Sequence, residues 1–219
     1  MTTTKAYKGL PMEGIIAGWY ARTTVKDLNR HKLMAKQLSG QIPAGGKVLE
    51  IAPGPGYFCL ELAKLGNFQI TGLDISKSFV DIARRNAAEA GLKIDFRQGN
   101  ASAMPFSDGL FDFTFCQAAF KNFSEPVKAI AEMYRVLKPT GTAVIVDMRR
   151  DASADDIERE VKGMHLDRIN EMMVRWTFKQ MLLKSAYSIP EMESMVSQTP
   201  FGRGRVDVGG IGFQIWLKK

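Results

Sequence analysis

The feature that most constrains the fold is the stretch of residues 48–58, where a short apolar run meets a turn rich in glycine and proline. The run predicts a strand, and an apolar segment with helical character begins at Tyr57. Gly54 and Gly56 lack a Cβ atom, so a ligand can lie close against their backbone. A helix that follows such a turn presents free N–H groups in its first turn. The stretch therefore predicts the strand–turn–helix unit that opens a nucleotide-binding α/β fold.

The middle of the chain alternates between strand and helix patterns. The expected strands are 47–51, 68–73, 93–97, 111–116 and 142–148, and the expected helices are 57–65, 76–90 and 125–137. Ser76 and Ser124 are expected to cap the second and third of these helices, and Gly91 is expected to end the second. Alternation of this kind predicts a mostly parallel sheet with helices on both faces.

Helical segments flank this alternating core. Residues 1–40 contain two expected helices, 13–20 and 25–38, and form a predicted N-terminal lid. Residues 41–219 form the main domain, with a helical insert at 151–189. Ser188 and Glu191 have the spacing of a capping box. A terminal hairpin of strands 203–208 and 211–217 completes seven strands.

Four further motifs follow residues 48–58 in a fixed order. They are Gly72–Ser76, Gly99–Phe106, Phe111–Cys116 and Glu132–Thr142. Together the five resemble the class I S-adenosylmethionine-dependent methyltransferases of the small type 11 group, over about residues 46–148. The resemblance implies a doubly wound, Rossmann-like, seven-stranded sheet and a transferase that converts S-adenosyl-L-methionine to S-adenosyl-L-homocysteine. The chain departs from the family at Ala52, where a third glycine is usual.

The resemblance also implies which residues hold the cofactor. These are Glu50, Ala52, Gly54, Gly56, Asp74, Ile75, Asn100, Ala101, Cys116 and Gln117. Asp74 is expected to accept both ribose hydroxyls, because the end of the second strand faces the ligand crevice of such a sheet. Glu50 is expected near the amino-acid end of the cofactor, and Asn100 near the adenine through its amide.

The acceptor side is less defined by the sequence. Tyr20 and His165 are the candidate catalytic residues, and both are candidate substrate-binding residues together with Lys121 and Asn122. Each has a structural alternative: a core aromatic for Tyr20, a surface or packing histidine for His165, and a solvated side chain for Lys121. The loop at residues 116–120 lacks the Asp/Asn-Pro-Pro-aromatic motif of amino-methylating relatives. It also lacks the Pro-Cys pair of pyrimidine ring methylation.

Composition limits the cellular setting. The chain has 219 residues, of which 45% are hydrophobic, enough for the core of one domain. No apolar run approaches the ~18 residues of a membrane span, and the first residues lack a signal-peptide core. The two cysteines and two histidines have no metal-ligand spacing. We therefore expect a cytoplasmic protein with no metal and no membrane partner.

The net charge of +7 is concentrated near the N-terminus. Residues 1–40 carry seven Lys or Arg against two Asp or Glu, a net charge of +5. These cations are spread out, which favours a solvated helix face over a patch for nucleic acid or an acidic substrate. The predicted function is direct methyl transfer to a small-molecule acceptor. The alternatives are methylation of RNA or protein, and a non-catalytic S-adenosylmethionine-binding protein. The sequence does not determine the oligomeric state, and a homodimer is one candidate.

Overall fold

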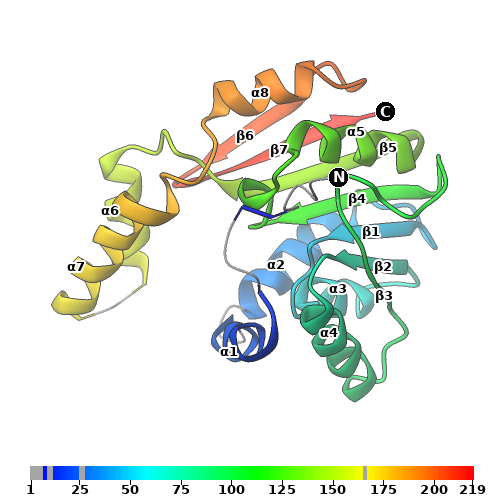
Figure 1. The fold of residues 1–219 in the computed structure, drawn as a ribbon, viewed down its shortest axis with the longest axis horizontal. Helices are drawn as coiled ribbons and strands as arrows, with labels where there is room; N and C mark the ends of the chain where they lie inside the picture. The colour runs from blue at the N-terminus through cyan, green and yellow to red at the C-terminus, as the bar shows by residue number, and fades with distance from the viewer. Residues whose placement is uncertain (1–6, 9–11, 25–27, 165–166) are drawn as a thin grey trace, which may run out of the picture.

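The fold is built on one seven-stranded sheet (Figure 1). The computed structural model describes residues 7–8, 12–24, 28–164 and 167–219. The strands are β1 (Lys47–Ile51), β2 (Gln69–Asp74), β3 (Asp95–Gln98), β4 (Phe111–Gln117), β5 (Leu137–Met148), β6 (Arg205–Gly209) and β7 (Gly212–Lys218). Their order is β3-β2-β1-β4-β5-β7-β6, and only β7 runs opposite to the other strands, so it pairs antiparallel with both β5 and β6. The predicted doubly wound, mostly parallel sheet is confirmed.

Helices cover both faces of the sheet. They are α1 (Gly14–Thr24), α2 (Leu28–Ser39), α3 (Tyr57–Ala63), α4 (Lys77–Glu89), α5 (Pro126–Val136), α6 (Ala154–Gly163), α7 (Arg168–Thr177) and α8 (Ile189–Ser197). Figure 1 shows α5 and α8 on one face and α2, α3 and α4 on the other. Each face thus has its own buried apolar cluster.

Side-chain alternation along β1 explains this division. Val48 packs into the cluster beneath α2, α3 and α4, whereas Leu49 and Ile51 pack into the cluster beneath α5 and α8. Successive side chains of a strand point to opposite faces, and all three of these are at most 1% exposed. Glu50 shares the face of Val48 and so points toward α3, which places a carboxylate between the sheet and a helix.

Two local predictions are wrong. Ser124 does not cap α5; the helix begins after Glu125 without a side-chain cap, and Pro126 occupies its first turn, where a proline has no missing hydrogen bond. β5 begins at Leu137, because Leu137 already pairs with Phe111 and the register then shifts before Phe113. The fifth strand was expected only from residue 142, and residues 137–141 are instead part of β5, next to a bulge in its pairing with β4.

The insert forms an arm that extends from the sheet at the left of Figure 1. Ser153 and Asp156 make a capping box at the start of α6, and a π-helix, Phe178–Leu182, follows α7. A small core joins the arm to the turn between β6 and β7; it is made of Ile157, Val161, Phe178, Leu183 and Ile211. The capping box at Ser188 and Glu191 is confirmed at the start of α8.

Candidate functional site

Polar side chains gather where the parallel strands end. Glu50 lies in β1, Asp74 ends β2, Gln117 ends β4 and Asp147 lies next to the last residue of β5. These four strands are neighbours and run parallel, so their carboxyl ends share one edge of the sheet. Ligands of doubly wound sheets bind outside this edge, at the point where the strand order reverses, and that point here lies between β1 and β4.

The turn at residues 52–56 has three residues in the left-handed region. Ala52, Gly54 and Gly56 have φ angles of 56°, 55° and 82°. A Cβ atom on Gly56 would lie 2.8 Å from Cζ of Phe96, whereas one on Gly54 would meet nothing within 4 Å. Gly56 therefore serves close packing of the turn against the protein, and Gly54 leaves its backbone open to a ligand.

Asp74 holds this turn in place. Its Oδ2 accepts the Gly54 N–H at 3.0 Å, and its Oδ1 accepts the Ser76 N–H at 2.9 Å. Burial raises the pKa of the Asp74 carboxyl to about 6, although the N–H groups of Ser76 and Gly54 act in the opposite direction. Ser76 caps α4 as predicted, since its Oγ accepts the Phe79 N–H at 3.0 Å.

Glu50 is buried against α3. Its Oε2 accepts a hydrogen bond from the Cys59 thiol at 2.8 Å. Burial raises the pKa of the Glu50 carboxyl to about 7; the hydrogen bonds of Cys59 lower it, and the charge of Asp74 raises it further. Neither Glu50 nor Asp74 forms a salt bridge with a cation in the part of the chain that the structure describes.

The loop after β3 contains the candidate adenine contacts. Oδ1 of Asn100 accepts the Ser102 N–H at 2.9 Å, so this side chain shapes its own turn. Ala101 is half-buried, and Ile75, just beyond Asp74, is 40% exposed. An apolar side chain that stays open beside Asp74 is available to cover the face of a flat ligand.

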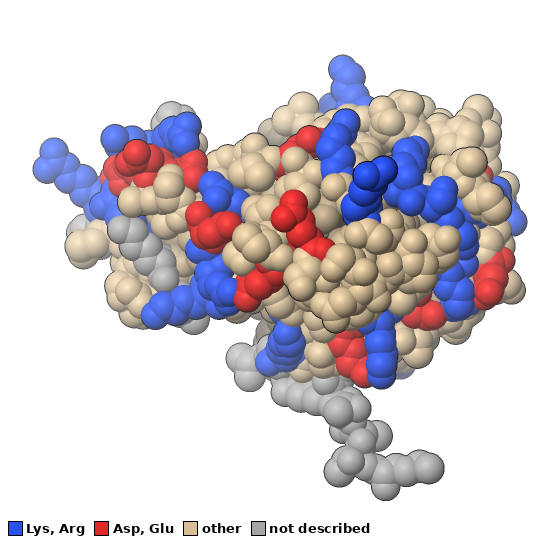
Figure 2. Space-filling view, turned by 90° about the horizontal axis from the view of Figure 1, so that it is seen from above, with Lys and Arg blue, Asp and Glu red and all other residues tan. Residues whose placement is uncertain are grey.

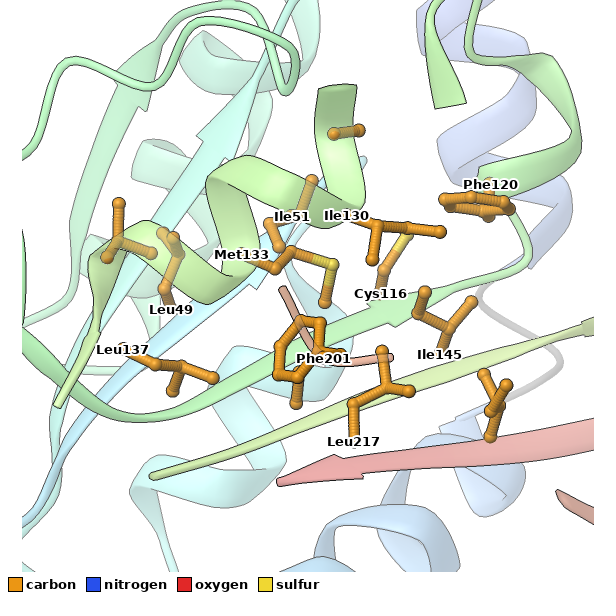
Figure 3. Packing of buried hydrophobic residues seen from close by; sticks show 14 of the residues in the cluster. Leu49, Ile51, Cys116, Phe120, Ile130, Met133, Leu137, Ile145, Phe201 and Leu217 are labelled. Atoms are coloured by element: carbon orange, nitrogen blue, oxygen red, sulfur yellow. The ribbon is translucent and has the colours of Figure 1, made fainter. Parts of the chain in front are cut away.

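Cys116 and Gln117 differ in their surroundings. Figure 3 shows the Cys116 side chain within the cluster beneath α5, near Ile130 and Phe120, and it is fully buried. Burial raises the pKa of the Cys116 thiol well above its ordinary value. Cys116 is therefore a packing residue at the end of the strand and not a nucleophile. The buried Oε1 of Gln117 has no partner within the described residues, so it remains available as an acceptor.

Lys121 is paired, not solvated as the structural alternative predicted. Its Nζ lies 3.0 Å from Oδ1 of Asp147, and the exposed fractions of the two side chains are 10% and 2%. Nζ also donates to the Ala118 carbonyl, and the Lys121 N–H donates to Oδ2 of Asp147. The carbonyl of Asn122, the next residue, accepts the Lys8 N–H at 2.8 Å. Lys121 and Asn122 thus tie the loop after β4 to β5 and to the N-terminal segment.

The N-terminal segment lies against the same edge. Tyr7 pairs with Phe123 in an antiparallel bridge. Burial raises the pKa of the Tyr7 phenol, and Tyr20, Asp74 and Asp147 act on it in the same direction. Tyr20 packs edge-on against Phe79 at a centroid distance of 5.7 Å. The structure therefore brings Tyr20 close to the carboxyl edge, whereas His165 lies outside the described residues.

Several residues at this edge were missed by sequence reasoning. Tyr7, Cys59 and Asp147 carried no motif, and the role of Glu13 was not expected. Both oxygens of Glu13 accept backbone N–H groups, from Lys77 and Ser78, at the start of α4. Asp147 alone had a usable signal, because it is a carboxylate near the end of a predicted strand.

Comparisons with known proteins agree with this geometry. Residues 49–145 match the family described as "Methyltransferase domain". The demethylmenaquinone methyltransferase of Deinococcus radiodurans is 36% identical over 108 residues, which are 49% of this chain and 45% of the relative. The ubiquinone/menaquinone biosynthesis C-methyltransferase UbiE of Bdellovibrio bacteriovorus is 31% identical over 137 residues, 61% of this chain and 58% of the relative.

The fold is also shared with a solved structure. A putative S-adenosylmethionine-dependent methyltransferase from Methanococcus maripaludis has a TM-score of 0.76 at 21% identity, and the match covers 100% of this chain and 96% of the other. The chain spans about half the length of the curated relatives it matches. These findings confirm the resemblance predicted from the five motifs. Within the described ranges, no helix has both the length and the apolar character needed to cross a membrane.

Proposed function

We propose, from the premise that residues 49–145 match a methyltransferase domain, that the whole chain transfers a methyl group from S-adenosylmethionine to a small-molecule acceptor. The observation that carries the proposal is the turn at 52–56, which is closed on the buried carboxylate of Asp74 through the Gly54 N–H, beside the buried carboxylate of Glu50. The relatives that match are named as methyltransferases, which supports the same reaction class.

The residues at the carboxyl edge fit S-adenosylmethionine. Gly54 leaves space for a ligand against its backbone, and the Asp74 carboxylate, which accepts backbone N–H groups, has further acceptor capacity for a ribose hydroxyl. Glu50 and Asp74 form no salt bridge with a cation in the described chain, so a ligand that carries ammonium and sulfonium charges supplies the missing compensation. The buried Oε1 of Gln117 offers a further acceptor.

The protein's contribution is mainly orientation. When bound, the cofactor supplies a methyl group already activated on a sulfonium sulfur. Holding acceptor and methyl group in line is worth about 7–11 kcal/mol. In this proposal Tyr20 and the loop at Lys121 and Asn122 line the acceptor side, residues 1–40 and the insert 151–189 cover it, and His165 serves as the general base. The names of the relatives support an aromatic, quinone-type ring as the class of acceptor.

Calorimetry with S-adenosylhomocysteine tests the cofactor site. Asp74→Ala removes two backbone hydrogen bonds and the ribose contact, so we expect affinity to fall by about 1–3 kcal/mol, roughly 5- to 150-fold in Kd. Asp81→Ala, on the exposed side of α4, is the matched control and should bind as the wild type does. Equal affinity of Asp74→Ala and wild type would remove Asp74 from the site, and binding of NAD in place of the nucleoside would overturn the assignment.

A labelled-methyl assay tests the acceptor. Transfer to hydroxylated aromatic compounds supports the proposal; transfer to RNA or protein supports the alternative; and binding without turnover across all three classes leaves a cofactor-binding protein. On the face drawn in Figure 2, Lys and Arg are interspersed with Asp and Glu, which gives no support there for a nucleic-acid surface. A cytoplasmic location and a homodimer stay predictions.

A further inference from the structure

Helix α1 has its large apolar side chains on the outside. Ile15, Ile16 and Trp19 are 88%, 45% and 60% exposed, while Ala17 and Ala21 are 0% and 7% exposed. Residues four apart share a face of a helix, so Ile15 and Trp19 lie on one side and the two alanines on the other. A surface helix ordinarily buries its large apolar residues, and α1 does the reverse.

The position of α1 is fixed, so this exposure is not that of a loose segment. The Tyr57 hydroxyl donates to the Ala21 carbonyl at 2.9 Å in a buried contact. The Gly14 N–H at the start of the helix donates to Oγ of Ser78 at 2.8 Å. The protein therefore holds the outer face of α1 toward solvent from both ends.

Helix α7 repeats the pattern. Met172, Met173 and Trp176 are 63%, 60% and 60% exposed, and Met172 and Trp176 are four residues apart on one face. Figure 1 shows α7 at the far left, on the arm, and α1 at the bottom of the molecule. We call the six exposed side chains of α1 and α7 the apolar rim. Single exposed apolar residues are ordinary, but a group of this size marks an interaction surface.

Positive charge accompanies the apolar rim. Arg22 is exposed on α1, seven residues from Ile15 and so on the same face. The next helix, α2, exposes Arg30, Lys32 and Lys36. Residues 1–40 carry seven cationic and two anionic side chains. The surface next to the α1 part of the rim therefore favours an anionic partner, and its charge opposes close approach of a second copy in the same orientation.

We propose that the apolar rim seats this protein on the surface of an anionic lipid bilayer. Trp and large aliphatic side chains flanked by Lys and Arg are the combination that inserts at the boundary between headgroups and acyl chains. The cations add attraction to anionic headgroups within a Debye length of the surface. The expectation of no membrane partner was based on the lack of a long apolar run. That lack argues against a transmembrane helix but not against binding to the membrane surface.

Vesicle flotation tests the proposal with the full chain. The probes are vesicles of phosphatidylcholine alone and of phosphatidylcholine mixed with phosphatidylglycerol. We expect binding to the mixed vesicles, weakening with added salt. The double variant Ile15→Ser, Trp19→Ser and the single variant Trp176→Ser should each bind at least roughly tenfold more weakly. Val208→Ser is the matched control, because Val208 is 55% exposed on β6 and lies outside the rim.

Two measurements separate a docking defect from a folding defect. Each variant should keep the wild-type affinity for S-adenosylhomocysteine, and brominated lipids should quench Trp19 and Trp176 while leaving the half-buried Trp216 of β7 unaffected. The proposal is overturned if neither vesicle type binds, if the rim variants bind as well as Val208→Ser, or if the rim instead holds a dimer that Trp19→Ser dissociates. A negative result here would not bear on the proposed cofactor site, because this experiment measures binding to lipid and the cofactor site is tested by calorimetry.

Discussion

A buried carboxylate lies near the ends of β1, β2 and β5, but over the described ranges it is paired with a cation only in β5. Glu50 and Asp74 are buried carboxylates that form no salt bridge with a cation among the described residues, and burial raises their pKa values to about 7 and about 6. Asp147 is as deeply buried but pairs with Lys121 at 3.0 Å. Backbone N–H groups bind the Asp74 carboxylate and a thiol binds that of Glu50. The Asp147 carboxylate is bound by the ammonium group of Lys121.

The difference indicates which part of the edge awaits a charged ligand. A buried carboxylate without a cation is destabilising while it is ionised, and a cationic ligand relieves that penalty on binding. A carboxylate that is already paired gains nothing from such a ligand and instead fixes the backbone around it. Under the function proposed above, the β1–β2 end therefore takes the cationic cofactor and the β4–β5 end takes the neutral acceptor.

The largest expected effect lies at the paired end. Lys121→Met leaves Asp147 buried without its cation, so the free energy of unfolding should fall by about 3–5 kcal/mol. Lys128→Met removes an exposed pair with Glu125 on α5 and should change stability by less than about 1 kcal/mol. Urea unfolding measures both. Equal losses in the two variants would show that the Lys121–Asp147 pair behaves as a surface ion pair, and the comparison would fail.

The unpaired end should reveal itself through pH. The pKa of Glu50 rises from 4.5 in the unfolded chain to about 7 in the folded protein, so between these values the folded state binds more protons. This group's contribution to stability is therefore lost as pH rises through that window. Glu50→Gln cannot ionise and so avoids this loss. The free energy of unfolding of the variant minus that of the wild type should therefore be about 3 kcal/mol larger above pH 7 than below pH 4.5.

A difference between Glu50→Gln and wild type that does not vary with pH would mean that Glu50 has the same pKa in the folded and the unfolded protein. The contrast between the two ends of the sheet would then lose its basis.

The two glycines of the turn separate packing from ligand access. Alanine at Gly56 or Gly54 takes a left-handed conformation, which costs about 1–2 kcal/mol at either position. Gly56→Ala also forces a Cβ atom to within 2.8 Å of Phe96, so it should lose a further 1–3 kcal/mol or so. Gly54→Ala should instead weaken binding of S-adenosylhomocysteine while staying the more stable of the two. The reverse order of stability in urea would contradict the assigned roles.

The smallest effect is expected at Ala52. Its φ of 56° is strained for a residue with a Cβ atom. Ala52→Gly removes strain of about 1–2 kcal/mol, partly offset by the freedom that glycine gains in the unfolded chain, about 0.5–1 kcal/mol. A net gain below about 1 kcal/mol should appear in thermal unfolding. Ala88→Gly, on the exposed side of α4, should lose stability instead; a loss in both variants would mean that Ala52 is not strained.

The parts predicted best are those that depend on local chemistry. β1 has the predicted bounds, Ser76 caps α4, and the capping box opens α8. In each case the information lies within a few neighbouring residues, in apolar alternation or in a side chain that reaches its own backbone. The cap expected at Ser124 failed because Pro126 starts α5 without one.

By itself the sequence determined the order of strands and helices, the glycine turn and the carboxylate at Asp74, because period, turn chemistry and motif spacing are properties of the chain. Only the tertiary structure decided which groups meet. Lys121 and Asp147 are 26 residues apart in the sequence, and Tyr7 and Phe123, which pair in a β-bridge, are much further apart in the sequence. The outward face of α1 likewise follows from where α3 and α4 anchor it. Parallel strands bring distant segments to one edge, and burial then sets the charge of what lies there.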